Sequence, residues 1–158
     1  MSRLILLDSG PLGLATNPRE SEPSRRCKAW LRKLLDADIQ IVVPEIADYE
    51  VRRELLRARR TEGIARLDEL GEQLGYLPVD GPVWRRAAEL WATARARGFQ
   101  TAHDKALDGD VILAAQALLA CDAGFDATIA TDNVAHLERF APARSWESIG
   151  VIDQHPTD

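Results

Sequence analysis

The stretch that decides the fold is Ala106-Leu107-Asp108-Gly109-Asp110-Val111-Ile112-Leu113-Ala114-Ala115-Gln116-Ala117-Leu118-Leu119. Ile112, Ala115 and Leu119 recur at the i, i+3, i+7 spacing of a helix that buries one face. An aspartate ahead of such a run can cap the helix, because its oxygens accept the free N–H groups of the first turn. One aspartate is enough for a cap. A second nearby carboxylate repels the first and raises its pKa unless a cation lies between them. A helix cap and a solvated acid are enough to explain this stretch taken alone. The recurrence of acids elsewhere in the sequence favours a cation between carboxylates.

Two more aspartates stand at the ends of short apolar runs. Asp8 follows the run Arg3–Leu7, and Asp132 follows Asp126–Thr131. A continuous apolar run that stops at a turn signal is typical of a buried parallel strand. Open α/β sheets bind ligands at the carboxyl ends of such strands. A simple turn explains Asp8 equally well on its own, so the argument depends on the repetition.

A glutamate is expected to reach the same region from a helix. The run Ile39–Val43 predicts another strand, and Pro44 suits the first position of a helix that continues to roughly Arg59. Glu50 borders the apolar stripe of that helix, and Glu54 lies inside it. An acid on or beside a buried face is costly unless it is paired or binds a metal. We expect Glu54 to turn away from the acids and to pair with an arginine.

The other segments complete an alternation of strands and helices, which predicts a parallel sheet with helices on both faces. We expect helices from residue 24 and at 64–74, 82–97 and 134–140, a brief extended segment at 76–79, a loop at 99–105 that exposes His103, and an edge strand within 143–152. In this architecture Asp8, Asp132 and one or both acids of the Asp108–Asp110 pair meet at the carboxyl edge of the sheet.

Composition bounds the class of protein. The chain of 158 residues fits a single domain over 1–158, with 46% hydrophobic and 28% charged residues. Its net charge of −5 argues against a broad basic surface for nucleic acid, although 17 of its 20 basic residues are arginine. We expect most of these arginines on solvated helix faces. The chain has no apolar run of membrane-spanning length, and Cys27 and Cys121 lack the spacing of a zinc site or a disulfide framework. We expect a cytoplasmic protein without a membrane segment.

Three or four carboxylates without matching lysines suit hard divalent cations such as Mg²⁺ or Mn²⁺. Such an ion can activate water and stabilise the charge of a phosphodiester during in-line displacement. Any one of these acids is a weak signal. Their order along the chain is more specific.

Four segments carry a resemblance to a known family: Leu6-Leu7-Asp8-Ser9, Pro44-Glu45-Ile46 with Glu50-Val51, Asp110 to Ala117, and Ala130 to Leu137. Over nearly its whole length the chain resembles the PIN domain, a metal-dependent ribonuclease fold that includes the VapC-type toxins of bacterial toxin–antitoxin pairs. The resemblance implies a three-layer α/β/α sandwich around a central, mainly parallel sheet. It also implies Mg²⁺ or Mn²⁺ as cofactor, an RNA substrate, a homodimer and, for a toxin, a small antitoxin protein as partner.

The resemblance also implies roles for individual residues. Asp8 is the first acid, Glu50 the helix acid and Asp110 the third, whereas Asp132 and Asn133 both remain candidates for the fourth position. Asp108 is a further metal ligand or a group that contacts the ligands. Ser9 and Thr131 are expected to position a metal-bound water by hydrogen bonding.

We weigh three functions from different classes. The first is a Mg²⁺- or Mn²⁺-dependent endoribonuclease that leaves 5′-phosphate and 3′-hydroxyl ends. The second is a haloacid dehalogenase-type phosphatase, suggested by Asp108-Gly109-Asp110. That family has its Asp-x-Asp pair after the first strand and a hydroxyl two residues further on, where this chain has Ile112. The third is a non-catalytic PIN-like module for RNA binding or assembly, against which the retention of the acids argues. We favour the nuclease.

Overall fold

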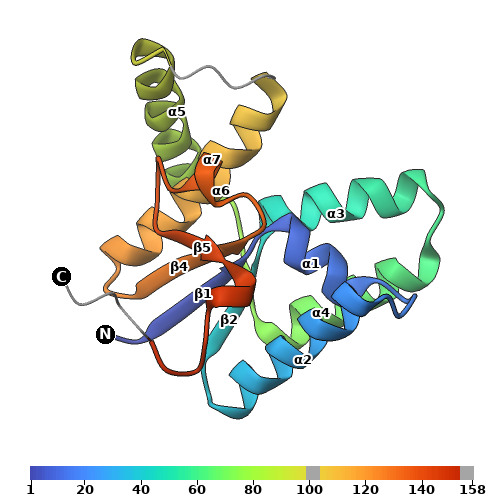
Figure 1. Ribbon diagram of the computed structural model, residues 1–158. Coiled ribbons are helices and arrows are strands. Elements are labelled where there is room, and N and C mark those ends of the chain that lie inside the picture. Colours follow the sequence, from blue (N-terminus) through green and yellow to red (C-terminus); the bar gives the residue numbers. More distant parts are fainter. Residues whose placement is uncertain (99–103, 154–158) are drawn as a thin grey trace.

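The sheet contains five strands, all parallel, among the residues that the computed structural model describes, which are 1–98 and 104–153 (Figure 1). The strands lie in the order β3-β2-β1-β4-β5. Their bounds are β1 Arg3–Leu7, β2 Gln40–Pro44, β3 Tyr76–Leu77, β4 Asp126–Thr131 and β5 Ala143–Ser145. In the centre, Leu6 of β1 stands opposite Val42 of β2 and Ile129 of β4. The carboxyl ends of β1 and β4 therefore lie next to each other.

The central strand β1 is buried on both faces, which explains its unbroken apolar sequence. Leu4 and Leu6 belong to one hydrophobic core, and Ile5 and Leu7 belong to the other. Successive side chains of a strand point to opposite faces, so a strand covered on both sides has no position for a polar residue. The two cores are the two interfaces of a three-layer arrangement.

Helices cover both faces of the sheet (Figure 1). On one side lie α5 (Gly81–Ala96) and α6 (Asp104–Asp122), and on the other lie α1 (Ser9–Thr16), α2 (Glu22–Asp36) and α4 (Thr61–Leu74). The helix α3 (Glu45–Arg57) starts directly at the end of β2 and contributes to both cores, and α7 (Val134–Leu137) follows β4. None of the described helices combines the length and the apolar character needed to cross a membrane. The predicted three-layer α/β/α fold with a parallel sheet is confirmed.

The structure differs from the sequence-based expectation in one element near the acids. The segment after Asp8, expected as a turn, forms the helix α1. Asp8 caps this helix by accepting the N–H of Ser9 at 2.7 Å, and Pro11 is tolerated because it lies in the first turn, where its missing N–H has no helical partner. This capping hydrogen bond fixes the Asp8 carboxylate at the start of α1.

Other differences concern burial and the chain's end. Two large apolar residues, Trp91 of α5 and Leu35 of α2, are 38% and 40% exposed. The last strand stops at Ser145 and gives way to the 3₁₀ turn η1 (Trp146–Ser148). Of the expected loop at 99–105, residues 99–103 with His103 lie outside the described residues, and α6 already begins at residue 104. The cysteines are free: Cys27 is buried and Cys121 partly buried.

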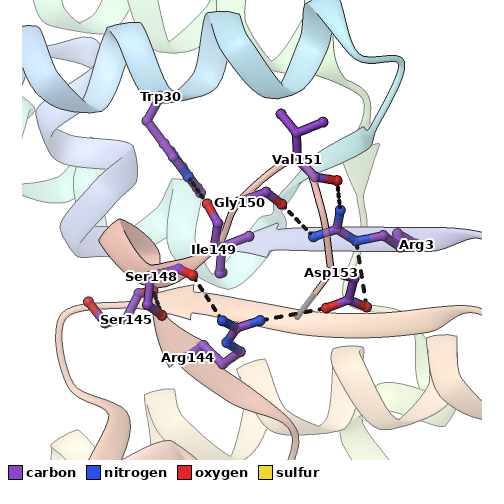
Figure 2. Close-up of polar contacts among 9 residues, drawn as sticks. All are labelled: Arg3, Trp30, Arg144, Ser145, Ser148, Ile149, Gly150, Val151 and Asp153. Carbon is purple, nitrogen blue, oxygen red and sulfur yellow. Dashed lines mark hydrogen bonds and ion pairs between the residues drawn. The ribbon is translucent and has the colours of Figure 1, made fainter. Parts of the chain in front are cut away.

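The segment after η1 is fastened across the start of the sheet (Figure 2). The Arg3 guanidinium donates to the carbonyl oxygens of Val151 at 2.8 Å and Gly150 at 3.0 Å. Asp153 lies within ion-pair distance of Arg3, at 3.9 Å, and of Arg144, at 3.7 Å. These contacts join β1, β5 and the segment that follows η1, and they keep the adjacent η1 turn against the body of the protein.

Candidate active site

Asp8 stands at the carboxyl end of β1 and receives two hydrogen bonds. Its Oδ1 accepts the N–H of Ser9, and its Oδ2 accepts the hydroxyl of Thr131, the last residue of β4, at 2.7 Å. The Thr131 oxygen in turn accepts the N–H of Asn133 at 2.8 Å. Burial raises the pKa of Asp8, and the neighbouring charge of Asp132 raises it further, while the two donors oppose this. The adjacent strands β1 and β4 thus bring Asp8, Ser9 and Thr131 together.

Glu50 reaches this region from α3. Burial raises its pKa to about 7, with repulsion from Asp8 and Asp110 adding to the effect, and Arg53 at 4.0 Å opposes it. The Glu50 carboxylate lies against the backbone of α6 at Gly109, where a Cβ atom would stand 3.3 Å from Oε2. Any side chain at position 109 would therefore press on Glu50.

Asp110 completes the buried group. Burial raises its pKa to about 6, and Asp8 contributes, whereas His136 and Arg139 lower it. One carboxylate oxygen, Oδ2, is buried and accepts no hydrogen bond among the described residues. The His136 Nδ1 lies 3.9 Å from it, too far for a hydrogen bond. Asp8 thus raises the pKa of both Glu50 and Asp110, and Asp110 has an acceptor oxygen without a hydrogen bond.

Asp132 lies just beyond β4 and is held by residues distant in sequence. Its Oδ1 accepts the indole N–H of Trp146 at 2.9 Å, and its Oδ2 contacts the backbone of α1 so closely that Gly10 has no room for a Cβ atom. Its charge acts on Asp8. Asn133 contributes its backbone N–H to Thr131, and no side-chain contact of Asn133 joins the acids in the described part of the chain. The geometry favours Asp132 for the fourth position.

Asp108 and Glu54 are more exposed than the acids of the buried group, although each lines a hollow that Glu50 also lines. Asp108 is exposed on α6 and lines hollows beside Trp84 and Trp91 on one side and Tyr49 on the other. Residues two apart on a helix do not face the same way, so α6 directs Asp110 inward and Asp108 outward. Glu54 is exposed and pairs with Arg57 at 2.7 Å, which confirms the expected pairing with an arginine.

The negative charge of these acids favours a bound cation, although their side chains are not arranged as a complete set of metal ligands. Among the described residues, no three His, Cys, Asp or Glu side chains are arranged as a ready metal site. The raised pKa values of Glu50 and Asp110, and the buried Asp110 oxygen without a hydrogen bond, show that Arg53, His136 and Arg139 compensate the negative charge here only in part. A divalent cation with oxygen ligands would supply that compensation. The residues present therefore fit a hard divalent ion.

Sequence reasoning missed the groups that hold the acids in place. Trp146 carries no signal by itself, because only the fold brings it to Asp132. Gly109 stands between two acids in the sequence and Gly10 two residues after Asp8, so a glycine near an acid is the one signal that the sequence offers. His136 lies in the segment Ala130 to Leu137, and the sequence predicts no role for it. Its position follows from α7, which turns back over α6.

Comparison with known proteins gives one family and several similar folds. The family model described as "PIN domain" matches residues 5–134. VapBC2 from Rickettsia felis, solved with a DNA fragment from its promoter, superposes with a TM-score of 0.66 at 14% identity, covering 90% of this chain and 98% of the other. FitAcB from Neisseria gonorrhoeae gives 0.64 at 21% identity, covering 92% and 99%. VapBC-1 from nontypeable Haemophilus influenzae gives 0.66 at 15% identity, also covering 92% and 99%. No curated protein sequence matches significantly. At these identities the structural likeness concerns the fold alone.

Proposed function

Because this chain belongs to the PIN domain family, we propose that it is an endoribonuclease that depends on Mg²⁺ or Mn²⁺ and leaves 5′-phosphate and 3′-hydroxyl ends. PIN domains are in general nucleases, and the choice of RNA and of a divalent metal is our proposal. The observation that carries it is the buried group of Asp8, Glu50 and Asp110, whose carboxyl pKa values are raised by burial and by neighbouring acids. Such groups with perturbed pKa values concentrate at functional sites.

The side chains divide into two roles. Asp8, Asp110 and Asp132 would hold the ion through their oxygen atoms. The ion, when bound, would stabilise the negative charge that develops on the phosphodiester and make a nearby water more acidic. Glu50, with a pKa of about 7, can exchange a proton near neutral pH and suits the general base that takes a proton from the attacking water.

The neighbours of the acids restrict their orientation. Thr131 and the Ser9 N–H hold the Asp8 carboxylate, and the Trp146 indole holds Asp132. Fixed ligands lower the cost of arranging the site when the ion and the substrate bind. In this proposal Ser9 and Thr131 act on Asp8 itself, in addition to the water-positioning role expected from the family.

Cleavage of a labelled single-stranded RNA tests the proposal directly. We expect cleavage with Mn²⁺ or Mg²⁺, none with EDTA, and products whose new 5′ ends carry phosphate. Asp110→Asn should cut at least about a hundredfold more slowly, because it removes charge from the site of the ion. RNA that stays intact with the wild type and either metal would contradict the proposed activity.

A toxin role and a small antitoxin partner are also proposed. Their support is the likeness in fold to VapBC assemblies, together with the family assignment. We expect a small protein, encoded beside this chain, to copurify with it and to block cleavage by placing a basic side chain near the acids. Expression of the neighbouring gene together with this chain tests the partner. A gene without any such inhibitor would remove the toxin role and leave the nuclease proposal intact.

We also propose that residues 1–158 act as one domain and that two copies associate. The phosphatase alternative finds no support in the structure. Asp108-Gly109-Asp110 lies inside α6 and not after the first strand, and its two acids point to different sides of the helix.

A further inference from the structure

A groove of about 690 Å³ runs between α1 and α3 and begins at Glu50 and at Ser9, the neighbour of Asp8. Ser9, Gly10 and Glu50 line it at that end, and Arg19 and Arg60 line it at the other. Figure 1 shows α1 beside the start of α3, and α4 following α3 after a turn. From Ser9 or Glu50 to the far end, each helix contributes about eight residues, or about 12 Å at 1.5 Å per residue. The groove is therefore a continuation of the candidate active site.

The far end of the groove is rich in arginine. Arg19 comes from the segment after α1, and Arg59 and Arg60 form the turn between α3 and α4. A smaller adjoining hollow of about 310 Å³ is lined by all three. None of the three makes an ion pair with a described carboxylate, whereas Arg57 of the same groove pairs with Glu54 at 2.7 Å. Exposed guanidinium groups without a partner gather here in a chain whose net charge is −5.

We propose that this groove holds the phosphate backbone of single-stranded RNA on one side of the cleavage point, with Arg19, Arg59 and Arg60 contacting phosphates. The inference rests on the proposed nuclease function and names the path of its substrate. A guanidinium group binds a phosphate in a bidentate manner and stays charged at any physiological pH. About 12 Å corresponds to three or four stacked nucleotides at about 3.4 Å each.

The charge distribution fits a polyanion that crosses both ends. At the acid end, a cation bound by the carboxylates would attract the phosphate that is cleaved. At the other end, the arginines meet phosphates directly. An acidic peptide would satisfy the arginines too, but it brings no phosphodiester to the cation site for cleavage. RNA uses both ends of the groove, and for that reason we favour it.

Gly13 offers a probe of the groove that leaves the fold intact. It lies on the α1 wall, and a Cβ atom added there would meet nothing within 4 Å. Gly13→Ala should therefore fit without a clash. Gly13→Glu should place a negative side chain in the groove and repel RNA, and the two variants form a matched pair.

The test is RNA binding measured by fluorescence anisotropy in EDTA, so that no cleavage interferes. The triple variant Arg19→Gln/Arg59→Gln/Arg60→Gln should bind a labelled single-stranded oligonucleotide roughly tenfold or more weakly. Its slope of log affinity against log salt should be shallower by about 2, at about 0.7 per lost phosphate contact. A control, Arg25→Gln/Arg32→Gln/Arg85→Gln, removes equal charge from exposed positions of α2 and α5 and should change both values much less.

Several outcomes would overturn the proposal. Equal losses in the two triple variants would mean that only overall charge matters, and a Gly13→Glu variant that binds RNA like Gly13→Ala would mean that the groove is not the path. A polyglutamate peptide that binds the wild type more tightly than RNA does, with the same loss in the groove variant, would assign the groove to an acidic protein instead.

The readouts separate this inference from the proposed function. A wild type that binds RNA through the groove but never cuts it with Mn²⁺ would contradict the nuclease and support the groove. A wild type that cuts RNA, while the groove variants bind and cut as it does, would contradict the groove alone. We expect the groove variants to raise KM for RNA cleavage and to leave kcat nearly unchanged, because their residues lie away from the acids.

Discussion

The acids depend on neighbours that have no side chain. Gly10 lets the Asp132 carboxylate approach α1, and Gly109 lets Glu50 approach α6. A methyl group at position 10 would overlap the Asp132 carboxylate and force it to move, and one at position 109 would press on Glu50, although neither glycine has an unusual backbone conformation. At these two positions glycine is required for close approach rather than for flexibility.

Asp8→Asn should separate the structural and the metal-binding roles of Asp8. Asparagine keeps the size and can still accept the Ser9 N–H, while the variant loses one of several crowded negative charges. Without metal, the melting temperature should stay equal or rise slightly. With Mn²⁺ in hundredfold excess over its Kd, the wild type should gain about 2.7 kcal/mol, and the variant much less. Thermal unfolding with and without Mn²⁺ measures both effects.

Asp108→Asn is the matched comparison on the same helix. Its side chain is exposed, and α6 turns it to a different side from Asp110, so the stabilisation by Mn²⁺ should remain close to that of the wild type. If Asp108→Asn lost the response to Mn²⁺ and Asp8→Asn kept it, the assignment of Asp8 to the metal would be wrong.

The raised pKa of Glu50 predicts how stability depends on pH. In the unfolded chain Glu50 ionises near 4.5, and in the folded protein near 7. Between these values the folded state binds more protons, so the free energy of unfolding falls as the pH rises from about 4.5 to about 7. Asp110, with a pKa of about 6, acts in the same direction.

Glu50→Gln should remove part of this slope, on the order of 1–3 kcal/mol over the interval after allowance for solvent screening. Denaturant unfolding at several pH values in EDTA, for wild type and variant, gives the difference. Identical slopes would mean that the Glu50 carboxyl is not perturbed. Added Mn²⁺ should flatten the slope of the wild type, because the cation favours the ionised carboxylates.

At the scale of elements, the segment from η1 to Asp153 contacts the candidate active site through Trp146. Trp146, 3% exposed, packs against Trp30 of α2 with ring centroids 5.5 Å apart and donates its indole N–H to Asp132. The Trp30 indole donates to the Ile149 carbonyl at 2.8 Å. The two tryptophans thus make similar packing contacts and one hydrogen bond each, but only Trp146 touches an acid.

Trp146→Phe and Trp30→Phe form a matched pair for this element. Each variant keeps an aromatic ring and loses one hydrogen bond, which should cost about 0.5–1.5 kcal/mol of the free energy of unfolding. Only Trp146→Phe should also weaken Mn²⁺ binding, by several fold, because Asp132 loses its orientation. Titration of the melting temperature with Mn²⁺ shows the difference. A similar loss of Mn²⁺ affinity in both variants would make Trp146 a packing residue and nothing more.

At the scale of the whole molecule, one face carries exposed aromatic residues. Tyr49 of α3 is 57% exposed and Trp84 of α5 is 56% exposed, and both line an apolar hollow around Ile112. The adjoining hollow contains Trp91. Large aromatic side chains are enriched in protein interfaces, so this face supports the proposed association of two copies.

Trp84→Glu should shift the protein from dimer to monomer, because it places a charge on this face. Size-exclusion chromatography with light scattering measures the mass. Leu56→Glu is the control, since Leu56 is 59% exposed on α3 but does not line the hollow, and it should leave the mass unchanged. A wild type that is monomeric at every concentration tested would contradict the association and would not affect the site.

The sequence by itself determined the strands, the layers and the positions of the acids along the chain. This was possible because continuous apolar runs identify strands covered on both faces, and parallel strands place their carboxyl ends at a common edge. Asp8 and Asp132 could therefore be placed near each other from local patterns alone. The family resemblance added the assignment of Glu50 as the helix acid and of Asp110 as the third acid.

Only the tertiary structure decided which groups surround those acids. The exposure of Asp108 depends on how α6 is rotated against the sheet, and the hydrogen bond from Trp146 depends on where the chain returns after β5. The exposure of Trp91 and the gathering of Arg19 with Arg59 and Arg60 likewise arise from packing between distant segments. Local patterns report the period of a helix or strand, whereas its rotation and its neighbours are set by contacts that close only when the whole chain has folded.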